Sequence, residues 1–379
     1  MDFELTEIQQ QYLKSLREFL RAEILPHTRA IEENVEILRT NLAKLAQFGL
    51  CALSFPEEYG GSGADIITNI LAWLELARVC PSTFLSMGAS TGLCGYTILS
   101  LGTAEQKEKY LRPLARGENI GAMALTEPSA GSDLAAAKTK AVLQNGQYLL
   151  NGSKMFCTNG PVADCVLVLA VTGETGGPHQ MSLIIVDKDC PGWSSGPPLD
   201  KMGVRGSPTS ALYFDDCHVP ANNLLGKANQ GFYHTMNCLT FFRIGMSCFS
   251  LGIAKASLDE AIKYANEREV FGQPIYNFQD VGFRLAEVKA EIDAAEMLIL
   301  QAAWKFQSGA DATMEASMAK LFASEVGKRA ADAAVQVHGG YGYITDYRVE
   351  QLYRDARLGE IGEGVSEVQR MLIARGLLF

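Results

Sequence analysis

The sequence is poor in the residue groupings that build metal sites and disulfide frameworks. It has five histidines and nine cysteines, and the cysteines are scattered without a Cys-x-x-Cys pair. Histidines and cysteines spaced in this way do not match the ligand patterns of zinc, so we expect no metal site. An odd number of cysteines in a chain of 379 residues favours free thiols in a reducing compartment.

Positive charge and long apolar runs are also lacking. Acidic residues outnumber basic ones by 43 to 33, and the net charge of −10 offers no general affinity for nucleic acid or anionic membranes. Because no apolar run reaches 18 residues, we predict no membrane span. The segment of residues 1–7 is acidic, through Asp2, Glu4 and Glu7, whereas signal and transit peptides begin with basic residues. These features favour a cytoplasmic protein.

Motifs of several common enzyme classes are absent. No Gly-x-Gly-x-x-Gly follows a predicted strand and opens a helix, which argues against a nicotinamide enzyme of the Rossmann type. A Walker-type phosphate loop and a Gly-x-Ser-x-Gly nucleophile elbow are missing as well. The chemistry must therefore be sought in other residues.

The period of the hydrophobic pattern changes twice along the chain. Helical spacing comes first, with Thr6 and Gln9 at the positions of a capping box and a glycine-rich helix expected at residues 85–101. Short β-rich runs follow, and Asn145-Gly146 between two of them is a strong hairpin signal. Several short strands at this spacing predict a small barrel or sandwich.

Long helices return in the last third. Residues 278–307 form one expected helix, with an apolar seam at spacings of three and four. A second is expected after a cap at Thr313, with Glu315 in its first turn. Long seamed helices that pack side by side form a bundle.

A carboxylate near the C-terminus stands between two glycines, in Gly362-Glu363-Gly364. Flanking glycines give the backbone freedom and leave room for a ligand against the main chain. A base that must reach a carbon-bound proton needs such a setting. The same pattern also fits a solvated loop residue, so Glu363 taken alone remains only a candidate base.

Two further groups open the strand-rich region. Thr126, Ser129 and Ser132 offer hydroxyls around an Ala-Gly pair, which suits a phosphate-bearing ligand, although such clusters are usually plain turns. Phe156 and Thr158 lie two residues apart, so on a strand their side chains point to the same side.

Together and in this order, these motifs resemble those of the acyl-CoA dehydrogenase family of flavoenzymes, over essentially the whole chain. Residues 126–133, 201–207 and 363–364 carry the resemblance most specifically. It implies a mainly α fold with a central β domain. The expected parts are an N-terminal helical domain (1–119), a middle β-barrel (120–228) and a C-terminal four-helix bundle (229–379).

The resemblance implies FAD as a non-covalently bound cofactor at a domain junction. Phe156 would stand against the flavin ring, and Thr158 would donate to flavin N5. Members of the family usually form homotetramers, and in them the positions that match Arg268 to Gly340 contact the cofactor of another subunit. The positions that match cofactor contacts are Leu125, Thr126, Ser132, Phe156, Thr158, Arg268, Phe271, Gln279, Gln336, Gly339, Gly340, Val365, Ser366 and Glu367.

The resemblance also implies the reaction. Glu363 matches the base that takes the α-proton of an acyl-CoA while a hydride passes from the β-carbon to the flavin. Ser132, Arg243 and Gly364 match substrate positions. The enolate oxygen would be stabilised in the manner of an oxyanion hole. Electron-transfer flavoprotein is the expected electron acceptor.

Four positions depart from common family usage. Gly362 stands where a large side chain often precedes the base, Phe156 replaces a Trp, and Val365 replaces a Thr. With the glycines of residues 88–95, Gly362 indicates a wide cavity and a short branched, cyclic or bulky acyl group. The alternative is that other side chains fill the space. Residues 240–243 lack a usual acidic residue, which leaves a thioester of acyl carrier protein open as substrate.

Two other functions share these residues. An enoyl-CoA reductase runs the same chemistry in reverse. A non-catalytic flavin-binding scaffold is the remaining alternative, and Glu363 in its expected place argues against it.

Overall fold

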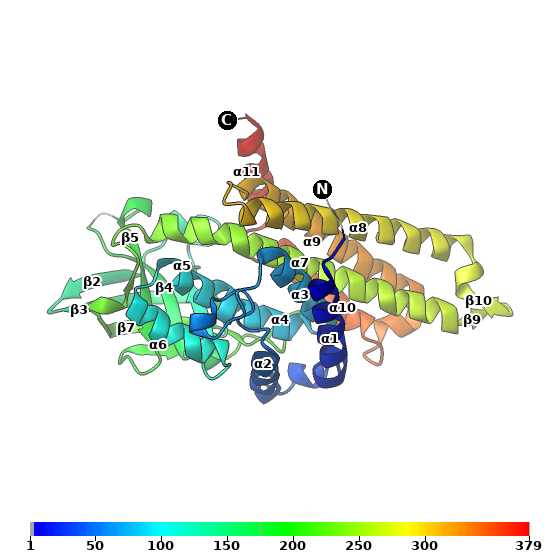
Figure 1. Cartoon of the computed structure of the whole chain (residues 1–379), viewed down its shortest axis with the longest axis horizontal. Helices are drawn as coiled ribbons and strands as arrows, with labels where there is room; N and C mark the ends of the chain where they lie inside the picture. Colours follow the sequence, from blue (N-terminus) through cyan, green and yellow to red (C-terminus); the bar gives the residue numbers. More distant parts are fainter. Residues whose placement is uncertain (1–3, 175, 379) are drawn as a thin grey trace.

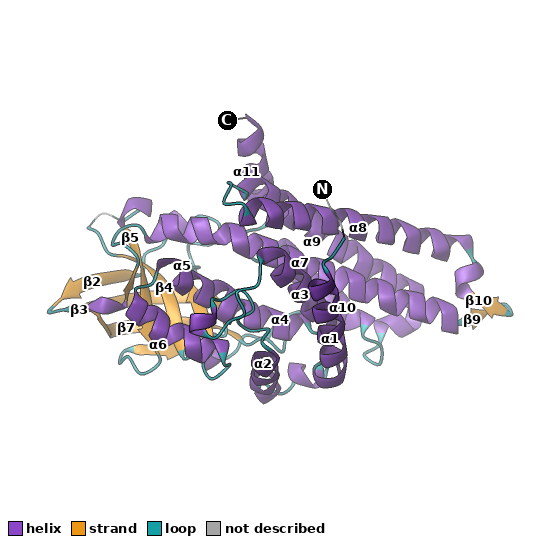
Figure 2. Cartoon of the chain, viewed as in Figure 1, coloured by secondary structure: helices purple, strands orange, loops and turns teal. Residues whose placement is uncertain are grey.

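The computed structural model describes residues 4–174 and 176–378. The strands of its large sheet gather at one end of the long axis, and long helices extend from them to the other end, where a short two-stranded sheet lies (Figures 1 and 2). The N-terminal helices lie against the middle of the molecule, and the C-terminal helix projects from the body. The predicted fold, mainly α with a central β region, is confirmed.

The N-terminal region begins with the predicted capping box. The Gln9 N–H donates to Thr6 Oγ1 at 3.2 Å, and the Thr6 N–H donates to Gln9 Oε1 at 3.1 Å. The second helix ends at Gly49, whose φ of +86° fits the left-handed cap that glycine favours. The helices here are α1 (Glu7–Glu23), α2 (Glu36–Phe48), α3 (Ile66–Val79) and α6 (Ala104–Ala115).

The expected glycine-rich helix is one continuous element with a π-helical middle. It comprises α4 (Pro81–Met87), the π-helix η4 (Gly88–Gly95) and α5 (Tyr96–Leu101). A Cβ on Gly95 would lie 2.7 Å from Cζ of Phe55, and one on Gly92 would lie 3.4 Å from the Trp73 ring. Two of the glycines therefore admit aromatic side chains of the protein itself.

The middle region forms an eight-stranded sheet. Its order is β6-β7-β3-β2-β4-β5-β8, with β1 paired in parallel to β4. Asn145 and Gly146 both have positive φ, at +49° and +78°, as a two-residue hairpin turn requires. The strands are β1 (Gly121–Ala124), β2 (Lys140–Gln144), β3 (Gln147–Thr158), β4 (Cys165–Val171), β5 (Met181–Asp187), β6 (Trp193–Ser195), β7 (Thr209–Pro220) and β8 (Leu224–Leu225).

The C-terminal region is built on α7, which is buried along most of its length between the other helices. The seam predicted for residues 278–307 is confirmed, because Val288, Ile292 and Ala295 of α8 are buried. The elements are α7 (Gly231–Glu267), β9 (Glu269–Val270), β10 (Gln273–Pro274), α8 (Gln279–Gln307), α9 (Thr313–His338), α10 (Val349–Ala356), η11 (Arg357–Glu360) and α11 (Ser366–Leu378).

The predicted cap at Thr313 is wrong by one position. Thr313 is the first residue of α9, and Ala312 occupies the cap position. The Thr313 N–H donates to Oδ1 of Asp311 at 2.9 Å. An aspartate ahead of the helix thus satisfies a free N–H of the first turn, which the hydroxyl was expected to do.

Two helical stretches among the described residues are long and apolar enough to cross a membrane, Pro81–Leu101 and Gly231–Glu267. The protein itself buries 61% and 89% of their most apolar windows, respectively. Core helices of folded proteins have the same length and composition.

Candidate active site

Glu363 lies on the turn between η11 and α11. Its φ is +52° and that of Gly364 is +91°, so two successive residues adopt the left-handed conformation. This conformation is uncommon for a residue with a side chain and must be held by its surroundings. Gln369 Nε2 donates to the carbonyl oxygens of Glu363 and Gly364, at 3.3 and 2.8 Å. Lys320 Nζ donates to the Gly364 oxygen at 2.7 Å.

The charges around Glu363 come from two other helices. Burial raises the pKa of the Glu363 carboxyl, and the positive charges of Arg243 on α7 and Lys320 on α9 oppose this rise. Burial lowers the pKa of Arg243, and it lowers that of Lys320 to about 8. One carboxylate and two buried cations therefore share a poorly solvated space, as at many sites of proton transfer.

The structure brings together Glu363 and Arg243, which the sequence had marked separately. Arg243 is buried, and its Nε has no hydrogen-bond partner. An unpaired buried donor leaves a binding capacity that a ligand can satisfy. Sequence reasoning missed Lys320. The signal was a lysine among small residues on one helical face, with Ala316 and Ala323 also buried.

The space beside Gly362 has a definite neighbour. A Cβ on Gly362 would lie 3.3 Å from Cε of Met246 and 3.5 Å from the Leu358 carbonyl oxygen. The end of a flexible thioether thus borders this position, and such a side chain adapts readily to neighbours of different shape. Met246 therefore borders the cavity that the sequence predicts beside Gly362. Nothing in the sequence indicated this contact.

The hydroxyl-rich loop after β1 is fastened by a buried ion pair. Lys154 Nζ lies 2.9 Å from Glu127 Oε1 and donates to the Leu125 carbonyl oxygen at 3.0 Å. The Met155 N–H donates to the Thr126 oxygen at 2.8 Å. Two of the predicted cofactor positions, Leu125 and Thr126, are therefore fixed against β3.

The same ion pair holds the far end of the loop. The N–H groups of Lys138 and Thr139 donate to the Glu127 carboxylate at 2.7 and 2.9 Å. Burial acts to raise the pKa of Glu127, but the Lys154 charge and these hydrogen bonds outweigh it, and the pKa is lowered. Between the two anchored ends, Ser132 is exposed.

Phe156 and Thr158 lie beside a β-bulge. The register of β3 on β7 shifts between Lys154 and Cys157, and Phe156 has a φ of +57°. The Phe156 side chain is 64% exposed and Thr158 is half-buried, while Cys157 between them is buried. That the two side chains point to one side stays a prediction, because the bulge, which was not foreseen, interrupts the regular alternation of the strand.

The bulge is tied to the helical region by the next residue. Asn159 Nδ2 donates to the carbonyl oxygens of Ser86 and Gly121, at 2.9 and 3.0 Å. Ser86 belongs to α4, and the continuous helix that follows packs against α7, which carries Arg243. The bulge is thereby linked, through one helix, to the element on which Arg243 lies.

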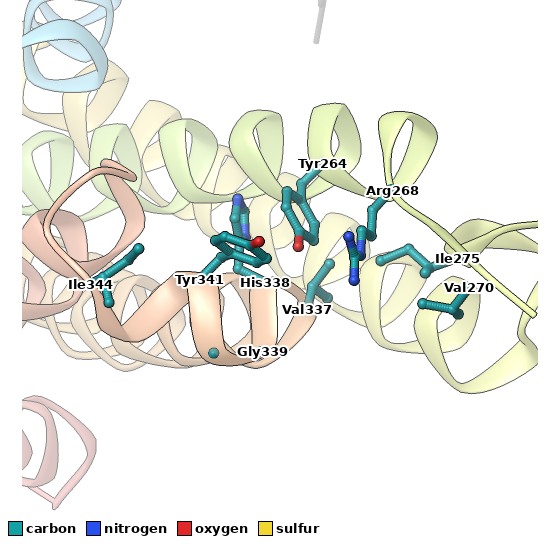
Figure 3. Close-up of a pocket in the computed structure, with 10 residues that line it drawn as sticks. Tyr264, Arg268, Val270, Ile275, Val337, His338, Gly339, Tyr341 and Ile344 are labelled. Carbon is teal, nitrogen blue, oxygen red and sulfur yellow. The ribbon is translucent and has the colours of Figure 1, made fainter.

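A second group lies at the far end of the bundle. Arg268, Gly339 and Gly340 line a cavity of about 500 Å³, together with the rings of Tyr264 and Tyr341 (Figure 3). The Arg268 guanidinium carbon stands 5.8 Å from the centre of the Tyr341 ring.

Three other predicted positions of this group are exposed outside the cavity lining. They are Phe271, Gln279 and Gln336. Phe271 is 94% exposed at the tip of the β9–β10 hairpin. Gln336 follows Lys320 by sixteen positions on α9, which corresponds to about 24 Å of helix. The second group is thus far from Glu363 within one chain.

The remaining predicted positions open α11. Ser366 is the first residue of the helix, and its Oγ is buried without a hydrogen-bond partner. Val365 is half-buried and Glu367 is exposed.

These residues fit a flavin nucleotide. Phe156 presents an exposed apolar ring for a flat aromatic group, and the half-buried Thr158 offers a hydroxyl two residues further on. Ser366 offers an unpaired hydroxyl at a helix N-terminus. Arg268 supplies a cation at a cavity wide enough for part of a nucleotide. No group of three or more His, Cys, Asp or Glu residues in the described chain is arranged to hold a metal ion.

Three family models match the chain in order. They are the N-terminal, middle and C-terminal domains of acyl-CoA dehydrogenases, at residues 6–118, 122–217 and 229–378. The "Probable acyl-CoA dehydrogenase YngJ" of Bacillus subtilis is 45% identical, covering 100% of both chains. The short-chain specific acyl-CoA dehydrogenase of Clostridium acetobutylicum is 42% identical, over 99% of each. The "Caffeyl-CoA reductase-Etf complex subunit CarC" of Acetobacterium woodii is 42% identical, over 92% of each.

Solved structures superpose on this chain over its whole length. Butyryl-CoA dehydrogenase from Megasphaera elsdenii superposes with a TM-score of 0.95, at 40% identity and complete coverage of both chains. A chain in a structure described as the electron transferring flavoprotein of Acidaminococcus fermentans gives a TM-score of 0.96. It is 43% identical, again with complete coverage of both.

Proposed function

This chain belongs to the acyl-CoA dehydrogenase family, and we propose that it oxidises an acyl-CoA between its α and β carbons, with Glu363 as the base. The observation that carries the proposal is the setting of Glu363, on a turn of two left-handed residues between buried cations from α7 and α9. A carboxylate held in this way is neither a solvated loop residue nor part of a simple ion pair.

The surroundings of Glu363 suit proton abstraction from carbon. Burial raises its pKa and strengthens it as a base, while Arg243 and Lys320 keep it ionised before the proton is taken. A base works best when its pKa lies near the working pH, and these opposing influences move it in that direction. The positive charge of Arg243 also favours a thioester ligand that carries phosphates.

FAD is the proposed cofactor, and when bound it supplies the acceptor for the hydride of the β-carbon. Phe156 and Thr158 would hold the ring, and Leu125 and Thr126 would line its surroundings on the fastened loop. The other proposed contacts in this first half of the cofactor site come from Ser132, Val365, Ser366 and Glu367. Ser132 and Gly364 are also proposed to lie near the substrate.

The second half of the cofactor site is proposed to come from another copy of the chain, in a homotetramer. Gln336 lies about 24 Å along α9 from Lys320 and is exposed, as are Phe271 and Gln279, and Arg268, Gly339 and Gly340 line the cavity nearby. Exposed Phe283 and Trp304 on α8 offer apolar surface for such an assembly. Analytical ultracentrifugation should give the mass of four chains, and a monomer that retains FAD would contradict this part.

The proposed substrate is a short branched, cyclic or otherwise bulky acyl-CoA. Gly362 adds no side chain beside the base, and the neighbouring Met246 can move aside. The relative from C. acetobutylicum supports a short acyl chain. A clear preference for octanoyl-CoA would contradict this choice.

Reduction of an enoyl-CoA is the second candidate, and the relative named as a caffeyl-CoA reductase subunit favours it. The same residues serve both directions, so the redox potential of the partner decides between them. That relative's complex with Etf also supports electron-transfer flavoprotein as the redox partner. The cytoplasm is the proposed location, on the acidic composition and free thiols alone.

An anaerobic titration tests the proposal. The purified protein should carry yellow FAD that bleaches when a suitable acyl-CoA is added, and the reduced form should be reoxidised by the matching enoyl-CoA. Glu363→Gln should keep FAD and the fold but lose bleaching, because the amide cannot accept the α-proton. If the variant bleaches as fast as the parent, Glu363 is not the base. A protein that retains FAD but bleaches with no thioester in a broad panel would be a scaffold.

A further inference from the structure

We propose that Lys320 is a positioning residue of this active site, which holds the turn that carries Glu363 and places a fixed positive charge behind its carboxylate. The inference rests on the proposed role of Glu363. It assigns a task to a buried side chain on α9 that is neither a cofactor contact nor a substrate contact in the function proposed above.

The position of Lys320 demands an explanation. Its side chain is completely buried, and a buried ammonium is unfavourable unless opposite charge and hydrogen bonds compensate for the lost water. A leucine or methionine would fill a similar volume without this cost. The presence of a lysine at this position therefore indicates a role other than filling space in the core.

The first task is mechanical. Lys320 Nζ donates to the carbonyl oxygen of Gly364, the residue after the base, at 2.7 Å. Gln369 Nε2 donates to the same oxygen at 2.8 Å, so two donors from α9 and α11 grip one carbonyl. Because Glu363 and Gly364 both have positive φ, the turn needs such external support to keep the carboxylate in one orientation.

The second task is electrostatic. The charged groups that act on Lys320 are Glu363, Glu360 at the end of η11, Arg243 on α7 and Glu367 on α11. Those that act on Glu363 are Arg243 and Lys320. Burial lowers the pKa of Lys320 to about 8, so the ammonium is charged at neutral pH. This charge opposes the rise in the pKa of Glu363 that burial causes.

The two cationic side chains near Glu363 differ in how firmly hydrogen bonds hold them. Arg243 Nε is buried without a partner, so this side chain can turn toward a ligand. Lys320 is anchored on the Gly364 oxygen and stays in place whether or not a substrate is bound. A fixed charge of this kind sets the pH at which the base becomes active without occupying the substrate space.

Two variants separate the tasks. Lys320→Met removes the charge and the donor, and Lys320→Gln removes the charge but keeps a donor. The Gly364 oxygen retains its bond from Gln369 in both, which favours folding, and circular dichroism checks this. Lys289→Met is the matched control, since Lys289 on α8 is exposed and pairs with Asp293. Neither residue is among the charges that act on Lys320 or Glu363.

The first readout is the pH profile of kcat/KM, measured with the thioester that bleaches the parent best. Both Lys320 variants should show an acid limb displaced to higher pH by roughly one unit, because an opposite charge near the base has gone. Lys289→Met should follow the parent. An acid limb at the parent's position in both Lys320 variants overturns the electrostatic task and with it the proposal.

The second readout needs no turnover. Amide hydrogen exchange over residues 361–368 should be at least several-fold faster in Lys320→Met than in the parent, and Lys320→Gln should lie between them. Unchanged exchange in Lys320→Met overturns the proposal. If no thioester bleaches the parent, the proposed oxidation fails, and the exchange rates still decide whether Lys320 holds the turn.

Discussion

Removing Lys154 should both destabilise the protein and weaken its hold on FAD. Lys154 and Glu127 form an ion pair at 2.9 Å whose side chains are 0% and 5% exposed. Lys154→Met would leave the Glu127 carboxylate buried with only the N–H groups of Lys138 and Thr139 as donors. Breaking a buried pair on one side typically costs about 3–5 kcal/mol.

The geometry also predicts that a second substitution recovers part of the lost folding stability. In Glu127→Gln/Lys154→Met, the buried charge is gone and one acceptor oxygen remains for the N–H groups of Lys138 and Thr139, which donate to different oxygens of Glu127. The double variant should therefore recover a coupling energy on the order of 1–3 kcal/mol relative to the sum of the two single changes. Lys154 also donates to the Leu125 oxygen, so the loop that bears Leu125 and Thr126 should stay loosened even in the double variant.

Urea unfolding and FAD retention together form the assay. Lys289→Met is the control, because Lys289 and Asp293 form an exposed pair on α8 and their separation should cost less than about 1 kcal/mol. FAD should dissociate more readily from Lys154→Met than from the control. A Lys154→Met protein as stable as the parent, with equal FAD affinity, would refute the reasoning that this pair fastens the loop.

Three further outcomes are expected. Burial raises the pKa of Asp355 to about 7, so the folded state holds a proton that the unfolded chain releases, and stability should fall by up to roughly 4 kcal/mol between about pH 4 and pH 7. Asp355→Asn should flatten this slope in urea titrations, and parallel slopes would contradict the assignment. Gly362→Ala would press on Met246, where the added Cβ meets Cε at 3.3 Å. It should lower kcat/KM for branched acyl-CoA about ten-fold more than for butyryl-CoA, whereas equal losses would exclude a cavity at this position. Phe271→Ala at the exposed hairpin tip should lower FAD retention in the assembled protein with unchanged helix content, and undiminished retention would argue against its cofactor role.

Much of the fold follows from local sequence signals. The capping box at Thr6 and the Asn145-Gly146 turn were predicted because a few adjacent side chains determine each of them. The seam of α8 follows from the helical period, which one face of a long helix must satisfy. The predicted helix cap at Thr313 was wrong, because the carboxylate of Asp311, two residues earlier, accepts the hydrogen bond from the Thr313 N–H.

The site was predictable in part, for a similar reason. Glu363 stood out because flanking glycines are a local signal, and the family resemblance supplied the cofactor positions. Lys320, Met246 and the Glu127–Lys154 pair were not found, since their meaning depends on which helices or strands pack together. The bulge at Phe156 was missed because its register shift depends on the partner strand β7.

The most direct test of the central claim is a crystal structure of the FAD-loaded protein with a non-reacting acyl-CoA analogue bound. We expect the Glu363 carboxylate to face the α-carbon of the thioester, with the acyl chain lying between it and the isoalloxazine. A carboxylate turned toward bulk solvent, or a space beside the flavin filled by protein side chains, would contradict Glu363 as the base.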